Sequence, residues 1–152
     1  MMENTKTIAK NRKALFEYFL LETYEAGIAL YGSEIKSIRA GQVSINEAFV
    51  QIENFEAWLV NAHIAPYESA SFFNHDPKRK RRLLLHKKEV LKLWNEVRQK
   101  GVTIVPVKLY LKNGLAKLEI ASAKGKKLYD KRDSIAKRDQ ERELSRSVKK
   151  YE

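Results

Sequence analysis

The side chains of this sequence that could do chemistry are mainly cations beside aromatic rings. Two phenylalanines, Phe72 and Phe73, precede a run of five adjacent cations. The run consists of Lys78, Arg79, Lys80, Arg81 and Arg82. We expect five adjacent cations to stay in solvent. Rings that stack on bases beside cations that contact phosphates are typical of single-stranded or loop RNA recognition, and a solvated linker is the equally weighted alternative.

A second set of cations lies in the last quarter of the chain, residues 125–152, at helical spacing. The positions that would share one helical face are Lys131, Ile135, Arg138, Arg142 and Arg146. Burying the three bulky aliphatic side chains of this segment would yield about 5 to 9 kcal/mol, whereas ordering its backbone costs tens of kcal/mol. We therefore expect a tail that is disordered alone and helical on a polyanion, with an ordinary charged terminus as the alternative.

Catalytic and metal-binding groups are scarce. The sequence has no cysteine, no glycine-rich phosphate loop and no metal-ligand spacing around its three histidines, His63, His75 and His86. We expect His63 to be structural, whereas His75 and His86 flank the basic run and could touch RNA. Asp76 before Pro77 is expected to form a turn. The sequence thus predicts a binding protein rather than an enzyme, without metal or cofactor.

Composition indicates the class of partner. The 152 residues carry 30 Lys and Arg against 19 Asp and Glu, a formal charge of +11, which favours nucleic acid over an anionic membrane surface. No run approaches the roughly 20 apolar residues of a membrane span. The first ten residues lack the apolar core of a signal peptide, and cysteine is absent, so we expect a cytoplasmic protein.

The first half of the chain predicts strands around one short helix. Residues 1–10 are polar and predict a mobile leader, and a β-rich run covers 14–30, with a bulge or sharp bend expected at Gly27. Ser33 as N-cap, Glu34 in the first turn and Gly41 as the stop predict a short helix. Alternation over 43–64 with a turn at Asn54 predicts a β-hairpin.

The second half predicts a loop, a helix and a hairpin. A loop covers 67–82, and Val90, Leu93 and Trp94 recur at helical spacing within 87–100, with Trp94 expected in the core. Strands over 105–111 and 116–120 flank the hairpin turn Asn113-Gly114. About six strands and two helices favour a mainly β fold, an antiparallel β-barrel of the oligonucleotide-binding type, over a two-layer α+β sheet. The expected division is a leader (1–10), a barrel (11–123) and a basic tail (124–152).

Three separate blocks of the sequence resemble the bacterial SsrA-binding protein family, also called small protein B. The blocks are Ala26–Gly27 with Gly32–Gly41, Asp76–Pro77 with Arg82–Leu85, and Ala123–Arg132. The resemblance implies a barrel that binds the tRNA-like domain of transfer-messenger RNA and delivers it to stalled ribosomes for trans-translation. The alternatives are a ribosome-associated structural or RNA-chaperone barrel without a dedicated RNA and, more distantly, an RNA-modifying enzyme.

The resemblance also implies RNA contacts at Asn11, Glu25 and Leu84. Since Glu25 cannot bind phosphate, it would accept hydrogen bonds from base edges or hydroxyls. From pattern alone Lys36 and Arg39 form a solvated helix face, and with the resemblance they become candidate contacts to the RNA backbone. The remaining candidate RNA-binding residues come from the basic run, namely Lys78, Arg79, Lys80 and Arg81.

In the family the tail serves the ribosome rather than RNA capture, and becomes helical in the messenger channel next to the decoding centre. The matching tail positions, with the periodic arginines, are Gly125, Lys126, Lys127, Tyr129, Asp130, Lys131, Arg132, Arg138, Arg142 and Arg146. We therefore expect truncation after Ala123 to spare RNA affinity and abolish tagging. We also expect a monomer when RNA is bound.

Overall fold

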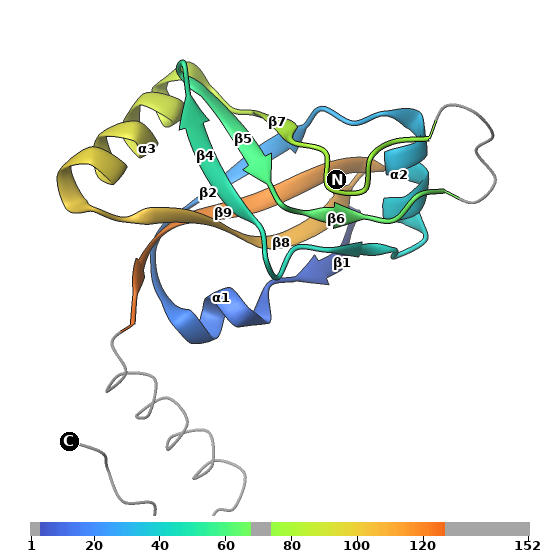
Figure 1. Ribbon diagram of the computed structural model, residues 1–152, viewed down its shortest axis with the longest axis horizontal. Coiled ribbons are helices and arrows are strands. Elements are labelled where there is room, and N and C mark those ends of the chain that lie inside the picture. The colour runs from blue at the N-terminus through green and yellow to red at the C-terminus, as the bar shows by residue number, and fades with distance from the viewer. Residues whose placement is uncertain (1–3, 68–73, 127–152) are drawn as a thin grey trace, which may run out of the picture.

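Six antiparallel strands close into a ring in the computed structural model, which describes residues 4–67 and 74–126 (Figure 1). The strands are β1 (Thr5–Lys10), β2 (Tyr18–Ile28), β3 (Val43–Ser44), β4 (Phe49–Glu53), β5 (Glu56–Val60), β6 (His63–Ile64), β7 (Arg81–Leu84), β8 (Thr103–Lys112) and β9 (Leu115–Gly125). The helices are α1 (Arg12–Glu17), α2 (Gly32–Arg39) and α3 (Lys87–Lys100).

The ring runs β8-β4-β5-β7-β2-β9 and closes through the pairing of β8 with β9. β3 and β6 form a separate two-stranded sheet. The long strands β2, β8 and β9 form one wall, and α3 lies at the end of the barrel beside the β4–β5 hairpin (Figure 1). This architecture confirms the predicted mainly β barrel of the oligonucleotide-binding type with six strands, and α1 is a helix beyond the two predicted.

The strand β1 corrects the prediction of a mobile leader for Thr5–Lys10. It pairs antiparallel with β8, from Thr5 opposite Lys112 to Lys10 opposite Lys108. The strand is largely exposed, so its sequence lacks the alternation of apolar and polar residues by which strands are recognised. This segment is held in the sheet by its backbone pairing with β8 rather than by burial of its side chains.

The start of the predicted β-rich run is helical instead. Asn11 caps α1, because its Oδ1 accepts from the Ala14 N–H at 3.0 Å and its Nδ2 donates to the Pro106 carbonyl at 2.8 Å. β2 then pairs with β9 over most of its length, and the register shifts between Leu20 and Thr23 rather than at Gly27. Of the two alternatives predicted at Gly27, the bulge is therefore wrong, because Ala26 and Gly27 pair in continuous register with Leu118 and Lys117.

The helix α2 begins one residue before the predicted cap. Its first turn is closed by Glu34, whose Oε1 accepts from the Tyr31 N–H at 2.8 Å, while Ser33 lies inside the helix. Gly41 follows the helix with φ of +77°, as its predicted role as a stop requires. Ile38 is fully buried in the barrel core, so α2 is fixed against the barrel by its apolar side.

The later elements follow the predictions closely, with two exceptions. Asn54 has φ of +51° in the β4–β5 turn, Asn113 has φ of +51° in the β8–β9 turn, and α3 ends at Gly101, whose φ is +63°. Residues 81–84, partly assigned to a loop, form the strand β7. Trp94, predicted to be core, is only partly buried and packs beside Phe55.

The core fills the barrel and the space under α2 and α3. Its largest buried apolar side chains are Ile38, Ile45, Val50, Leu59, Ile64, Leu83, Leu93, Ile104, Leu109, Leu118 and Ile120. No helix among residues 4–67 and 74–126 is long and apolar enough to cross a membrane.

Candidate nucleic-acid interface

Glu25 presents a charged carboxylate on the outer face of β2. The Tyr110 hydroxyl donates to its Oε2, and Lys112 Nζ lies 3.5 Å from its Oε1. The hydrogen bond from Tyr110, followed by the positive charges of Lys112 and Lys117, lowers the pKa of Glu25. The carboxylate therefore stays ionised at neutral pH, where it can accept hydrogen bonds.

Leu84 forms an apolar ridge between two hollows. Its side chain is 52% exposed and lies over Gly27, where an added Cβ would come within 3.2 Å of the Leu84 Cβ. A hollow of about 400 Å³ on one side of the ridge is lined by Glu25, Arg82 and His86 among others. A larger residue at position 27 would therefore require Leu84 to shift by a few tenths of an ångström.

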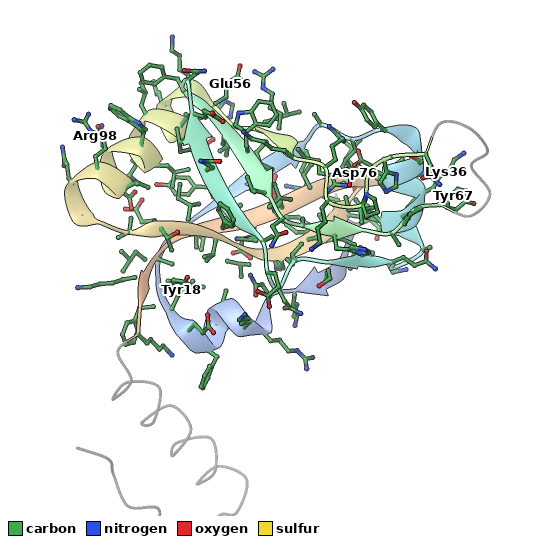
Figure 2. All side chains as sticks on the ribbon, in the orientation of Figure 1. Tyr18, Lys36, Glu56, Tyr67, Asp76 and Arg98 are labelled. Carbon is green, nitrogen blue, oxygen red and sulfur yellow. The ribbon has the colours of Figure 1, made fainter. Side chains whose placement is uncertain are left out.

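The hollow on the other side of Leu84 measures about 330 Å³ and is more apolar. Ile28, Leu30 and Leu115 contribute to it, and Arg39 from α2 supplies a cation. Lys36 does not line this hollow. Its Nζ lies 5.6 Å from the centroid of the Tyr67 ring, at the α2 end of the molecule (Figure 2).

Lys117 lines both hollows, and sequence reasoning did not select it. It comes from β9, and its place follows from the register in which Lys117 pairs with Gly27 on β2. Arg82 belongs to the basic run and to a block that resembles the family, but neither observation places it beside Glu25. Strand pairing brings Lys117 and Arg82 to Leu84, and no local pattern in the sequence shows this.

The basic run is divided by burial, which corrects the expectation that all five cations stay in solvent. Arg81 is 0% exposed, and its Nε donates to Glu34 Oε2 at 2.7 Å, while Arg79 Nη2 donates to Glu34 Oε1 at 2.6 Å. Arg81 Nη1 also donates to the Ala62 carbonyl at 2.9 Å. A fully buried carboxylate thus makes burial of Arg81 possible.

The other cations of the run are exposed. Lys78 follows the Asp76 turn, in which the Lys78 N–H donates to Asp76 Oδ1 at 2.9 Å. Lys80 Nζ lies 2.5 Å from Glu53 Oε2 and 4.9 Å from the Trp58 ring centroid. Arg82 is the member of the run that lines the hollow beside Glu25.

Two other candidate residues have structural partners. Asn11 is 1% exposed and serves as the cap of α1, and it lines a separate hollow of about 140 Å³ with Lys13 and Glu17. His75 is buried, with Nδ1 2.8 Å from Ser33 Oγ and Nε2 donating to the Ile64 carbonyl at 2.8 Å. The suggestion that His75 touches RNA is therefore wrong.

Of the tail positions, the structure describes Gly125 and Lys126. Gly125 ends β9 opposite Tyr18, the Lys126 N–H donates to the Glu17 carbonyl at 2.8 Å, and Lys126 Nζ lies 5.2 Å from the Phe19 ring centroid. The remaining tail positions lie outside the described residues. These are Lys127, Tyr129, Asp130, Lys131, Arg132, Arg138, Arg142 and Arg146.

A barrel with an exposed acid, an apolar ridge and cations on one face defines a class, the RNA-binding barrels of the oligonucleotide-binding type. Within this class, the SmpB protein family model matches residues 8–150. The chain belongs to the SmpB family.

Relatives and a solved structure agree with this membership. The chain is 54% identical to the SsrA-binding protein of Desulforudis audaxviator (strain MP104C), covering 97% of this chain and 96% of the relative. It is 56% identical to the SsrA-binding protein of Ligilactobacillus salivarius (strain UCC118), covering 95% of this chain and 93% of the relative. A chain of the solved structure "tmRNA-SmpB: a journey to the center of the bacterial ribosome" is 47% identical, with a TM-score of 0.66, 93% of this chain and 97% of that chain covered.

Proposed function

We propose that this protein binds the tRNA-like domain of transfer-messenger RNA and delivers it to stalled ribosomes for trans-translation. The observation that carries the proposal is the Leu84 ridge between two hollows, with Glu25 on one side and Arg39 on the other. Family membership and the names of the relatives support it. The protein acts by binding and not as an enzyme, in the cytoplasm, where ribosomes translate.

The face around Leu84 suits a folded RNA with exposed bases. Glu25 accepts hydrogen bonds from base edges or from 2′-hydroxyls, and its negative charge is offset by Lys112 and Lys117. Leu84 packs against the apolar face of a base or ribose. Arg39 and Arg82 contact phosphates and fix the RNA on the barrel. Residues 125–152 then serve the ribosome.

Sequencing of the RNA that co-purifies with the protein tests the proposed function. Transfer-messenger RNA is expected as the main species. A mixture of ribosomal RNA fragments without transfer-messenger RNA would instead identify a ribosome-associated barrel without a dedicated RNA.

We expect Leu84→Asp to weaken binding of the tRNA-like domain about tenfold or more, because it places a negative charge between the two hollows and removes the apolar contact. The thermal midpoint should change little, since Leu84 is exposed. Leu15→Asp on α1 is the matched control, because Leu15 is exposed to a similar degree. Fluorescence anisotropy with labelled tRNA-like domain measures both affinities, and equal affinities for the two variants would exclude this face.

The salt dependence of binding reports the phosphate contacts. We expect the logarithm of the affinity to fall linearly with the logarithm of the salt concentration, by about 0.7 to 0.9 for each phosphate contacted. Arg39→Gln should reduce this slope by about the value for one phosphate, because we propose that Arg39, at the rim of the RNA-binding face, contacts a phosphate. Arg12→Gln, on α1, should leave the slope unchanged. An RNA affinity of the unmodified protein that does not change with salt concentration would indicate apolar docking instead.

A further inference from the structure

A cluster of aromatic rings and a cation lies at the end of the barrel near α3. We call Phe55, Trp94 and Arg98 the Trp94 cluster. The Phe55 and Trp94 ring centroids are 5.6 Å apart with planes tilted by 54°, and the Arg98 guanidinium carbon lies 4.2 Å from the Trp94 centroid. Phe55 is 57% exposed, and Figure 2 shows Arg98 on the outer side of α3. The cluster therefore presents two tilted, partly exposed rings to solvent.

The turn that holds Phe55 does not call for a phenylalanine. Asn54 and Phe55 have φ of +51° and +60°, so both central residues of the β4–β5 turn are left-handed. Glycine is the usual second residue of such a turn, and a bulky side chain in this conformation is unfavourable. The backbone geometry thus opposes the residue, and most of its ring is not buried. The turn therefore does not explain the phenylalanine, whose ring instead lies against Trp94 and remains largely open to a partner.

Next to the cluster lies a hollow of about 210 Å³ between α3, β4 and the start of β8. Trp94 and Arg98 line it, together with Val97, Gln51 and Thr103, which bring apolar surface, an amide and a hydroxyl. This combination is suited to a nucleobase, which offers flat apolar faces and a polar edge. The hollow shares no lining residue with the two hollows beside Leu84.

The charge of α3 selects an anionic partner. In the part of the chain that the structure describes, no carboxylate lies within salt-bridge distance of Lys87, Lys88, Arg98 or Lys100. The acids of the helix are occupied, since Glu89 accepts from the His86 N–H and buried Glu96 accepts from the Tyr24 hydroxyl. A polyanion with exposed bases, which is single-stranded RNA, fits both the charge and the rings.

We propose that the Trp94 cluster and its hollow bind an unpaired nucleotide of single-stranded RNA, at a surface separate from the Leu84 face. The base stacks on the exposed Phe55 ring or on the Arg98 guanidinium, and the cations of α3 contact the flanking phosphates. This inference goes beyond the proposed function, because it gives the barrel a second RNA contact that can be occupied while the first is filled.

The test uses the full chain carrying Trp58→Phe, which leaves Trp94 as the only tryptophan. The anisotropy of a fluorescein-labelled uridine hexamer, titrated with the protein, measures binding. In a second titration, Trp94 emission is recorded while unlabelled hexamer is added to the protein. We expect saturable quenching of Trp94. We also expect about tenfold weaker binding in Arg98→Gln and in Phe55→Gly, whose Asn-Gly turn favours the fold. Arg12→Gln is the matched cation control.

Three outcomes would overturn the proposal. The first is an unchanged Trp94 emission when anisotropy shows the hexamer bound. The second is an equal affinity of Arg98→Gln, Phe55→Gly and Arg12→Gln for the hexamer. The third is displacement of the hexamer by the tRNA-like domain, which would mean that the two RNAs share one surface. Retained quenching in the presence of the tRNA-like domain supports it. Failure of this proposal can be distinguished from failure of the proposed function, because Leu84→Asp should weaken binding of the tRNA-like domain and leave binding of the hexamer unchanged.

Discussion

A chain truncated after Lys126 is expected to bind the tRNA-like domain as tightly as the full chain and to lose peptide tagging on stalled ribosomes. The Leu84 face lies wholly within the retained residues. The removed residues carry the periodic arginines Arg138, Arg142 and Arg146, which we propose contact the ribosome. Anisotropy measures the RNA affinity, and a tagging assay with ribosomes stalled without a stop codon measures the function.

The structure moves the truncation point from Ala123 to Lys126. Lys124 and Gly125 pair with Phe19 and Tyr18 of β2, and the Lys126 N–H donates to the Glu17 carbonyl. A chain ending at Ala123 would lose these bonds, so a failure to tag could then reflect a weakened barrel. Normal tagging by the chain that ends at Lys126 would refute the proposed role of the tail.

Glu34→Ala is expected to destabilise the fold by about 3 to 5 kcal/mol, because it leaves the fully buried Arg81 without its carboxylate. Urea unfolding measures the decrease in the free energy of unfolding. Replacing both partners, as in Glu34→Met with Arg81→Met, should be less damaging than Glu34→Ala, since no buried charge remains. A loss below about 1 kcal/mol for Glu34→Ala would show that the pair contributes little.

The same carboxylate makes stability depend on pH. Burial opposes the charged form of Glu34, but hydrogen bonds from Arg79, the Tyr31 N–H and Arg81 outweigh it and lower the pKa. A lowered pKa stabilises the folded state above the unfolded value of about 4.3. This stability is lost as the pH falls from there through the folded pKa. The stability difference between the unmodified chain and Glu34→Gln should therefore shrink in acid.

Local signals made several elements predictable from sequence. The α3 helix and the β8–β9 hairpin depend on apolar periodicity and on turn residues such as Asn113 and Gly101, which act within a few positions. β1 was missed because a largely exposed strand carries no alternating pattern. Residues 14–17 are helical although their pattern predicts a strand. Asn11 is a favoured N-cap and thus a local signal for α1, whereas its second bond, to the Pro106 carbonyl, joins segments that are distant in the sequence.

The candidate site was predictable only in part for the same reason. Glu25 and Leu84 were selected through the family resemblance, and the structure brings them to one hollow. The burial of Arg81 depends on Glu34, 47 residues earlier in the chain. Lys117 depends on the pairing register of β9 with β2. Contacts between distant segments decide these positions, and no local pattern encodes them.

The entry of the chain into the barrel has a practical consequence for experiments. The Asn113 N–H donates to the Asn4 carbonyl, and the Asn4 N–H donates to Asn113 Oδ1, so the described chain starts beside the β8–β9 turn. The next residue of that turn, Gly114, lines the hollow that contains Arg39. An affinity tag fused upstream of Asn4 would be tethered at the rim of this hollow. RNA affinities should accordingly be measured after removal of any amino-terminal tag.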